Sequence, residues 1–346
     1  MTTHSSRFVC SLTLGRALTA AGLLAAAAAC SSQETPSASF APTADRAARA
    51  YADAGRCPAA VVYAAGRDAI QVYDANNLKG GRCGRITGLV APQGLLVDSK
   101  RNLWVVDPVN RQINKFAPGT HAPVLTLRDT GGTPNAIALD EASGTAYVTE
   151  YKNDADATTL VQVYAGGSTT PTGSLHDPAA RNGGFAAVDS QGNVYVTFMT
   201  QDNKAQVDRF AAGSSNPENL GLKLISAGAI ATTKSGALAI CDPAAYRCGV
   251  FELGSKNISH VFGHMGMGRA GVRPDKAPFI IPEAFALDRG ERHAYVAGGS
   301  VTQWAYPGPA NRPNHTPQAE IKLPGFDNPA GGIAVSPASR PGAAYY

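Results

Sequence analysis

The chain has 346 residues, of which 44% are hydrophobic and only 16% are charged, and it contains 37 Gly and 23 Pro. Intrinsic disorder needs more charge and fewer apolar residues, and a helical bundle would use more Glu, Lys and Leu and less Gly, so this composition disfavours both. The net charge of +4 is modest and spread along the chain, so it gives no electrostatic footprint for nucleic acid.

The first 29 residues are typical of a bacterial export signal. Arg7 and Arg16 supply a positive n-region, and the apolar stretch from Ala17 to Ala29 is rich in small residues. A membrane-spanning helix needs about 20 apolar residues, so this stretch is too short to span stably but suits the h-region of a signal peptide. The pattern predicts secretion across the inner membrane followed by cleavage.

The end of this segment resembles the lipobox of bacterial lipoproteins. Small residues lead directly into Cys30 and Ser31, although Ala27 stands where the family usually has Leu. The resemblance implies that Cys30 carries a palmitate-bearing lipid, and that the Ser after it favours the outer membrane or cell surface over retention at the inner membrane. The alternative is an ordinary signal peptide cut beside an unrelated Cys, with release into the periplasm.

A tether follows the predicted lipid site. Residues 31–43 are rich in Ser, Pro, Ala and Thr and bury too little apolar surface to order themselves. Thr43 is a suitable N-cap for a short helix from Ala44 to Ala54, and Gly55 is its stop signal. Residues 30–57 therefore form an anchor site, a tether and a short helix ahead of a folded domain at 58–346.

The folded domain is predicted to consist of six repeats. Each repeat has a strand of small apolar residues, a tight turn, a strand rich in Tyr, Val or Trp, a polar loop and an alternating strand ending in an aromatic residue. Five repeats are continuous and the sixth is split between the two ends of the domain: Gln93–Gly119, Asn135–Gly167, Gly184–Gly213, Gly228–Gly254, Glu283–Gly308, and Ala59–Asp74 with Gly331–Tyr346.

A fourth apolar segment leads from each repeat into the next. Four short strands in about 42 to 55 residues is the spacing of β-propeller blades. Small residues suit the first strand because six backbones converge there around a narrow channel. The clearest fourth segments are Pro123–Asp129, Pro171–Asp177, Leu220–Ser226 and Ala319–Gly325.

This repeat resembles the NHL repeat and the related SMP-30/gluconolactonase-like six-bladed propellers. The shared pattern begins with an apolar run, an acidic residue and a turn that contains Asn or Gly. A strand with Tyr or Trp followed by Val comes next and leads to an Asp. The pattern closes with an alternating strand that ends in Phe. The resemblance covers residues 58–346 and implies an all-β fold of six four-stranded blades. It is uninformative about chemistry, because propellers host enzymes, scaffolds and ligand-binding modules alike.

The split repeat predicts that the two ends of the domain share one blade. Gly332–Ser336 is expected as the innermost strand beside Val61–Ala65, followed by Ile70–Tyr73 and Arg85–Leu89, because this pairing removes exposed sheet edges. Gly342–Tyr346 competes with Val61–Ala65 for the second place. The N-terminal segment is favoured because it runs directly into its hairpin partner.

The cysteines divide by compartment. Cys10 leaves with the signal and Cys30 is the lipid site, so four cysteines remain in an oxidising environment, where three pairings are possible. We expect Cys241–Cys248, which flanks the turn of one hairpin, and Cys57–Cys83, which ties the start of the domain to the closing blade. The alternative, a metal site, lacks any C-x-x-C pair.

Candidate site residues gather where the chain enters the innermost strands. SMP-30-like propellers hold a divalent cation there with Glu, Asn and Asp, and the resemblance implies Glu283, Asn135 and Asn182 as candidate ligands of an ion such as Ca²⁺. No cofactor is certain, because Asn and Asp before a strand also serve as turn formers. The other polar residues expected on this face are Gln93, Asn328, Asp107, Glu150, Tyr151 and Asp242.

Histidines offer a second kind of site. His176 and His264 fall near the ends of the fourth segments of different repeats, and His260 lies four residues before His264. A neutral imidazole suits proton abstraction in a lyase-like propeller. His176, His264 and Glu150 are therefore the candidate catalytic residues. The alternative is a half-exposed polar role on an outer strand. Neither G-x-S-x-G nor H-E-x-x-H occurs, so hydrolase and protease functions lose their usual support.

The sequence thus predicts a lipid-anchored propeller on the periplasmic or outer face of a bacterial membrane. We expect a monomeric binding or scaffold module for an unknown protein or small molecule. The alternative is a metal-dependent lactonase-like or lyase-like enzyme with its site at the mouth of the central channel.

Overall fold

The computed structural model describes residues 57–129, 131–151, 159–263, 284–298, 300–308, 317–322 and 332–339, all within the second of two compact units, Pro42–Tyr346. The predicted signal, lipid site, tether and helix from Ala44 to Ala54 lie outside these residues. No helix in the described ranges has the length and apolar character needed to cross a membrane.

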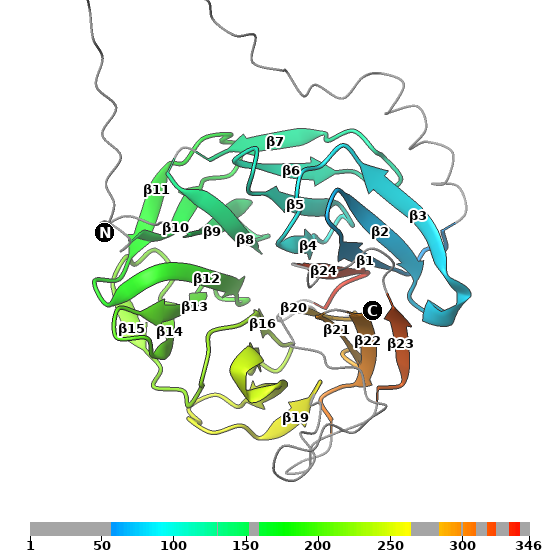
Figure 1. Ribbon diagram of the computed structural model, residues 1–346. Coiled ribbons are helices and arrows are strands. Elements are labelled where there is room, and N and C mark those ends of the chain that lie inside the picture. Colours follow the sequence, from blue (N-terminus) through cyan, green and yellow to red (C-terminus); the bar gives the residue numbers. More distant parts are fainter. Residues whose placement is uncertain are drawn as a thin grey trace, which may run out of the picture. The chain divides into compact units, whose positions relative to one another are not determined.

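Six four-stranded antiparallel sheets surround a central channel, which confirms the predicted six-bladed β-propeller (Figure 1). We number blades 1 to 5 in chain order and call the sixth the closing blade. Blades 1 and 2 comprise β4 (Leu95–Val97), β5 (Leu103–Asp107), β6 (Gln112–Phe116), β7 (Leu125–Arg128), and β8 (Thr133–Asp140), β9 (Thr145–Tyr151), β10 (Thr159–Tyr164), β11 (Gly173–His176).

The remaining blades have the same order from the channel outward. Blades 3, 4 and 5 comprise β12 (Ala180–Val188), β13 (Val194–Thr200), β14 (Ala205–Phe210), β15 (Pro217–Asn219); β16 (Ile230–Thr232), β17 (Leu238–Asp242), β18 (Arg247–Phe251), β19 (His260–Phe262); and β20 (Ala284–Leu287), β21 (His293–Ala297), β22 (Ser300–Ala305), β23 (Ala319–Lys322). The closing blade comprises β24 (Ile333–Ser336), β1 (Val61–Ala65), β2 (Ala69–Asp74) and β3 (Arg82–Thr87). In the described ranges, the short 3₁₀ helices η2 (Leu78–Gly80) and η3 (Pro243–Ala245) lie in loops.

The closing blade joins the two ends of the domain as predicted. β24 pairs antiparallel with β1, with Val62 opposite Val335, and β1 pairs on its other side with β2. Val61–Ala65 therefore fills the second place in this blade. The competing segment Gly342–Tyr346 lies outside the described residues.

One fourth strand differs from the prediction. In blade 3 it is β15, Pro217–Asn219, whereas Leu220–Ser226 is not a strand. The reason is that Asp242 of the next blade accepts the backbone N–H groups of Ile225 and Ser226, at 2.8 and 2.9 Å. Partly buried leucines of the same segment pack between blades 3 and 4. The segment therefore serves as the connection into blade 4.

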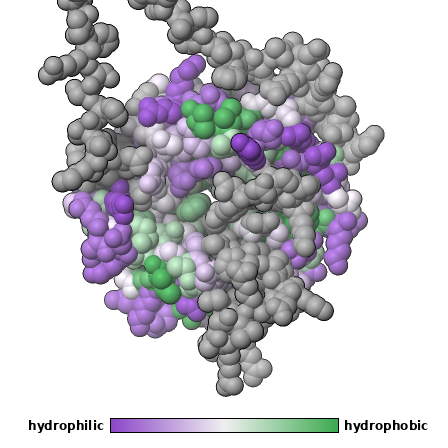
Figure 2. Space-filling model, in the orientation of Figure 1, coloured by the Kyte–Doolittle hydropathy of each residue, from purple (hydrophilic) through white to green (hydrophobic). Residues whose placement is uncertain are grey.

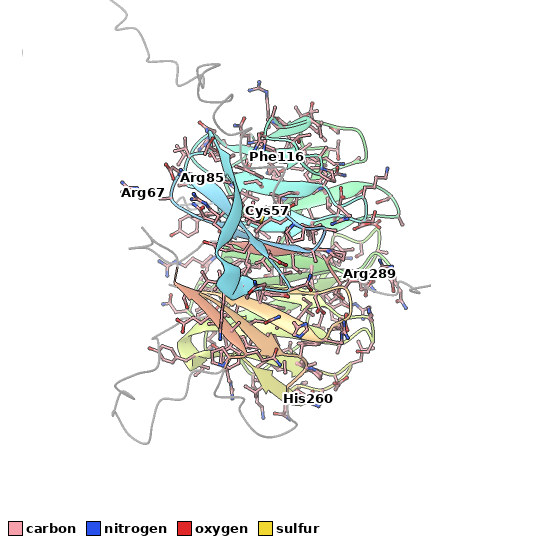
Figure 3. The ribbon with its side chains drawn as sticks, turned by 90° about the vertical axis from the view of Figure 1, so that its right-hand side faces the viewer. Cys57, Arg67, Arg85, Phe116, His260 and Arg289 are labelled. Atoms are coloured by element: carbon pink, nitrogen blue, oxygen red, sulfur yellow. A yellow bond between two sulfur atoms is a disulfide. The ribbon has the colours of Figure 1, made fainter. Side chains whose placement is uncertain are left out.

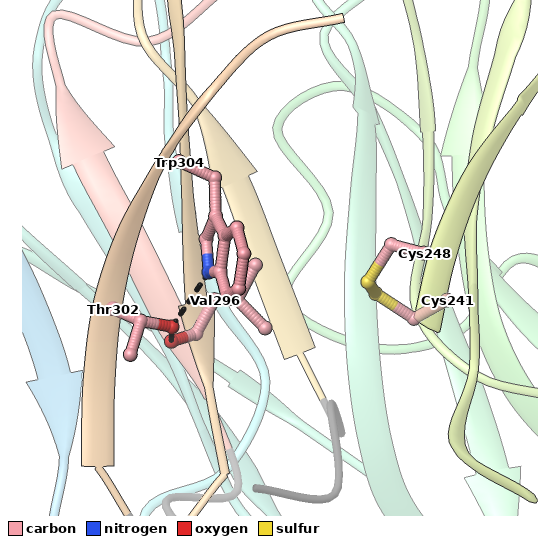
Figure 4. Close-up of a disulfide and its surroundings, with 5 residues drawn as sticks. All are labelled: Cys241, Cys248, Val296, Thr302 and Trp304. Atoms are coloured by element: carbon pink, nitrogen blue, oxygen red, sulfur yellow. Dashed lines mark hydrogen bonds between the residues drawn. A yellow bond between two sulfur atoms is a disulfide. The ribbon is translucent and has the colours of Figure 1, made fainter. Parts of the chain in front are cut away.

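Apolar clusters fill every interface between neighbouring blades. Trp104 and Tyr164 belong to the cluster between blades 1 and 2, and the largest cluster joins blade 4, blade 5 and the closing blade. That largest cluster contains the Cys241–Cys248 disulfide and Trp304, whose Nε1 donates to Thr302 Oγ1 at 2.8 Å (Figure 4). Burial of these side chains is the main force that holds the blades together.

The acidic turn of the repeat has a clear local cause. In blade 1, Asp98 accepts hydrogen bonds from the backbone and side chain of Asn102 and, at 3.1 Å, from Trp104 Nε1. In blade 3, Asp189 accepts equivalent bonds from Asn193 and, at 3.0 Å, from the Tyr195 hydroxyl. One carboxylate thus closes the turn between the first two strands and orients the aromatic ring beside it.

Both predicted disulfides are confirmed. Cys57 is bonded to Cys83 with 5.0 Å between their Cα atoms, and this bond attaches the start of the domain to β3. Cys241 and Cys248 lie directly opposite each other on β17 and β18, and both are fully buried.

We expect the two disulfides to differ in their contribution to stability. They close loops of 26 and 7 residues, for which the loop-entropy relation gives about 3.5 and about 2.4 kcal/mol. The double variants Cys57→Ser/Cys83→Ser and Cys241→Ser/Cys248→Ser should both lower the free energy of unfolding, measured by guanidinium denaturation. The loss should be larger for Cys57→Ser/Cys83→Ser. Alkylation of four free thiols without reductant would contradict the pairing itself.

Glycines stand where neighbouring innermost strands approach each other. A Cβ on Gly94 would lie 2.6 Å from Ala136 Cα and 2.7 Å from the Asn135 carbonyl oxygen of blade 2. A Cβ on Gly332 would lie 2.4 Å from the Gln93 carbonyl oxygen of blade 1. These contacts confirm that the small first-strand residues permit the backbones to converge.

The substitution Gly94→Ala tests this constraint. The added methyl group meets backbone atoms that cannot move without opening the ring, so we expect a loss of about 1 to 3 kcal/mol in the free energy of unfolding. Gly173→Ala is the matched control, because a Cβ there has no atom within 4 Å. Equal effects of the two substitutions on thermal unfolding would contradict the packing argument.

Candidate functional site

The propeller has two faces, which differ in the loops that they carry. The connection face carries the links from each outermost strand to the next innermost strand and the loops between second and third strands. The turn face carries the turns between first and second strands and between third and fourth strands. The sequence predicts a candidate site on the connection face, at the mouth of the channel.

Most side chains that line the central channel cavity are apolar. The cavity, of about 160 Å³, receives residues from all six innermost strands, and Thr232 and Ser339 are the hydroxyl side chains among its described lining residues. Such side chains favour a ligand by shape and apolar contact. Each blade contributes at least one lining residue. From blade 1 to blade 5 and then the closing blade, examples are Leu96, Ile137, Ala186, Ile230, Ala286 and Ala334.

Two acids of the connection face bind backbone groups. Asp107, at the end of β5, is fully buried and accepts the backbone N–H of Val90 at 3.3 Å and the side-chain amide of Asn110 at 2.9 Å. Asp242 holds the same position in blade 4 and accepts the N–H groups of Ile225 and Ser226. Both carboxylates therefore attach the connection that arrives from the preceding blade.

Glu150 occupies the same position in blade 2. Its side chain is fully buried, and a Cβ on Gly131 would lie 2.6 Å from its Oε1 atom. The connection from blade 1 thus passes directly against the carboxylate, at a residue without a side chain. Burial, with the charges of Asp129 and Glu150, raises the pKa of Tyr164 far above its usual value. A catalytic role for Glu150 stays a prediction.

The predicted cation ligands are only partly described. Asn135 Nδ2 donates to the Gly184 carbonyl oxygen at 2.5 Å, so this amide links blade 2 to blade 3. Asn182 has its backbone in β12 but no described side chain, and Glu283 and Asn328 lie outside the described residues. The described part of the chain contains no group of three or more His, Cys, Asp or Glu placed to hold a metal. A cation site at Glu283, Asn135 and Asn182 stays a prediction.

The described histidines of interest lie on outermost strands. His176 ends β11, is exposed, and has its Nε2 atom 2.7 Å from Ser174 Oγ. His260 begins β19, which is also the outermost strand of its blade (Figure 3). The channel is lined by innermost strands, so the fold does not bring these two side chains to its mouth. His264 lies outside the described residues, and catalysis by His176 or His264 stays a prediction.

Sequence reasoning missed a buried acid pair between blades 2 and 3. Asp208 lies in β14 with its side chain fully buried, and Asp177 follows β11. Gln206 Nε2 donates to Asp208 Oδ1 at 2.8 Å, and Asp177 accepts the N–H of Ala179 at 2.6 Å. Burial, together with a hydrogen bond to Asp177, raises the pKa of Asp208 to about 7. A neighbouring carboxylate disfavours the charged form of a buried carboxyl group, so the protonated form of Asp208 is favoured.

This pair predicts a definite pH dependence. The pKa of Asp208 is higher in the folded than in the unfolded protein, so the folded state binds more protons and stability falls as the pH rises from about 4 to about 7. The variant Asp208→Asn removes this loss. We expect it to match the wild type in thermal unfolding near pH 4 and to exceed it at pH 8, by on the order of 1 to 3 kcal/mol.

The control for this prediction is Asp202→Asn. Asp202 is exposed, and a hydrogen bond from Lys204 lowers the pKa of its carboxyl, so its removal has a small effect of opposite sign. A difference between Asp208→Asn and the wild type that did not change with pH would show that the acid pair is not protonated in the folded state.

Comparison with known proteins identifies the fold. No family model matches the chain, and no curated protein sequence does. A chain in the crystal structure of the nidogen/laminin complex is similar to it, with a TM-score of 0.61 and 16% identity over 80% of this chain and 98% of that chain. The chain is a six-bladed β-propeller.

A second solved structure is more distant. Hydrazine synthase of Kuenenia stuttgartiensis matches with a TM-score of 0.48 and 15% identity over 68% of this chain and 70% of that chain. At these identities the first similarity supports the fold alone. The resemblance of the propeller to the NHL and SMP-30-like families stays a prediction.

Proposed function

We propose that the chain is an exported, lipid-anchored propeller whose connection face binds a partner. The observation that carries the proposal is the placement of exposed apolar side chains. Of the six large hydrophobic residues that are exposed in the described part of the chain, four lie on the connection face. These four are Val90, Val109, Tyr151 and Ile225, and the two on the turn face are Val124 and Leu253.

The acids of the connection face support this proposal. Asp107 binds the backbone N–H of Val90, and Asp242 binds the backbone N–H of Ile225. Each acid fixes the connection and leaves the apolar side chain in solvent, 42% exposed at Val90 and 64% at Ile225. A surface whose backbone is already ordered loses little conformational entropy when it binds.

The surface of the molecule is mixed in character. Figure 2 shows hydrophobic patches between hydrophilic side chains on one face of the molecule. Binding interfaces commonly combine apolar anchors with a polar rim. A binding or scaffold role therefore agrees better with the described residues than a role that needs reactive groups at the channel mouth.

A photocrosslinking experiment tests the binding role. A photoreactive amino acid at Ile225 should give a discrete adduct in cells of the source organism, whereas the same residue at Leu253 should not. Leu253 is the matched control because it is 71% exposed, belongs to the neighbouring blade 4, and lies on the turn face. Equal adducts from both positions, or none from Ile225, would overturn the assignment of the connection face.

The lipid anchor is tested separately. The Cys30→Ala variant should move from the membrane fraction to the soluble fraction and lose incorporation of labelled palmitate. Cys10→Ala is the control, because that residue lies within the predicted signal and should leave both readouts unchanged. A Cys30→Ala protein that still sediments with membranes and still incorporates palmitate would eliminate the anchor at this residue.

A further inference from the structure

A second cavity lies between the closing blade and blade 1, outside the channel. It has a volume of about 160 Å³, and the turn from Pro118 to His121 forms part of its lining. We call it the blade-1 crevice. Its apolar lining consists of Val61, Val72, Ile86, Leu103 and Phe116, and its main polar lining of Tyr63, Arg85, Arg101 and His121.

The size of the crevice suits one aromatic ring. An apolar protein cavity of about 150 Å³ binds benzene. Ile86, Leu103 and Phe116 belong to the buried cluster between the closing blade and blade 1, so the floor is part of the packed core. Figure 3 shows Arg85 and Phe116 near Cys57, whose disulfide to Cys83 lies at the crevice.

Arg101 joins the two blades that border the crevice. Arg101 lies in the turn after β4 with a φ of 66°. Its Nε atom donates to Ser336 Oγ at 3.2 Å, and its guanidinium also donates to the Ala59 carbonyl oxygen. These bonds join blade 1 to the closing blade. A preformed pocket of this kind needs little rearrangement to accept a ligand.

The arginines give the polar lining a positive charge. The crevice is lined by two arginines and one histidine, and its lining among the described residues includes no Asp or Glu. Arg101 uses two of its five N–H groups in the bonds above. Burial raises the pKa of Tyr63, so its hydroxyl stays protonated near neutral pH and can donate a hydrogen bond. All of these groups favour an anionic acceptor.

Arg85 points to the same ligand class. Its Nε atom is buried and has no hydrogen-bond partner among the described residues. Its guanidinium contacts Asp68 at 3.0 Å, but the two side chains are 36% and 73% exposed. Exposed ion pairs contribute little to stability, so an incoming carboxylate can compete with Asp68. Arginine also pairs with carboxylates through two parallel hydrogen bonds.

We propose that the blade-1 crevice binds a small aromatic carboxylate, with the ring against Ile86 and Phe116 and the carboxylate toward Arg85 and Arg101. The site is independent of the proposed partner-binding patch, because none of the exposed residues Val90, Val109, Tyr151 and Ile225 lines the crevice. Failure of one proposal therefore leaves the other untouched.

Benzoate titrated into the mature protein, with binding followed by calorimetry or ligand-observed NMR, tests the proposal. We expect benzoate to bind at least tenfold more tightly than benzyl alcohol, which has the ring without the charge, or acetate, which has the charge without the ring. Equal affinity for benzoate and benzyl alcohol, or no binding of benzoate at millimolar concentration, would overturn it.

Variants then locate the site. Arg85→Gln should weaken benzoate binding at least threefold, whereas Arg67→Gln should leave it unchanged, because Arg67 is exposed nearby but does not line the crevice. Ile86→Trp should fill the crevice and abolish binding, with its thermal unfolding measured alongside. If Ile86→Trp does not fold, the two arginine variants decide the question. A similar loss for Arg67→Gln and Arg85→Gln would reject the site.

Discussion

The antiparallel pairing of β24 with β1 is the contact on which the rest of the propeller depends. Each blade buries its faces only against two neighbours, so an open array would expose two apolar faces and two strand edges. Joining a strand from the end of the domain to three strands from its beginning closes the ring. The channel, the apolar clusters and both candidate binding surfaces exist only in the closed ring.

Closure also explains the distribution of hydrogen-bonding groups between blades. Thr149 and Thr197 each donate to a carbonyl oxygen of the following blade, at Gly184 and Gly228 and at 2.8 Å in both cases. Acids at the ends of second strands accept N–H groups from the preceding connection. Neighbouring blades are thus joined by polar bonds as well as by apolar packing, which limits their relative movement.

Equivalent positions of the repeat carry different chemistry. The third strands place Asn114, Gln162 and Asp208 at corresponding sites of blades 1, 2 and 3. In blade 3 this site meets Asp177 from the preceding blade and becomes a buried acid pair. Repetition of the backbone therefore specifies where a side chain lies, while the individual residue decides its charge and pKa.

The repeat pattern predicted the number of blades and the split closing blade, because the strand order within each repeat shows which strand is missing at either end of the domain. Cys241–Cys248 followed from a hairpin whose strands are near in sequence, and Cys57–Cys83 was the pair that remained. The fourth strand of blade 3 was wrong because its position depends on Asp242, a residue of the next blade. The acid pair Asp177–Asp208 and the blade-1 crevice also needed the tertiary structure. Each joins residues of different blades, and a periodic sequence states which residues recur but not which side chains face each other across an interface.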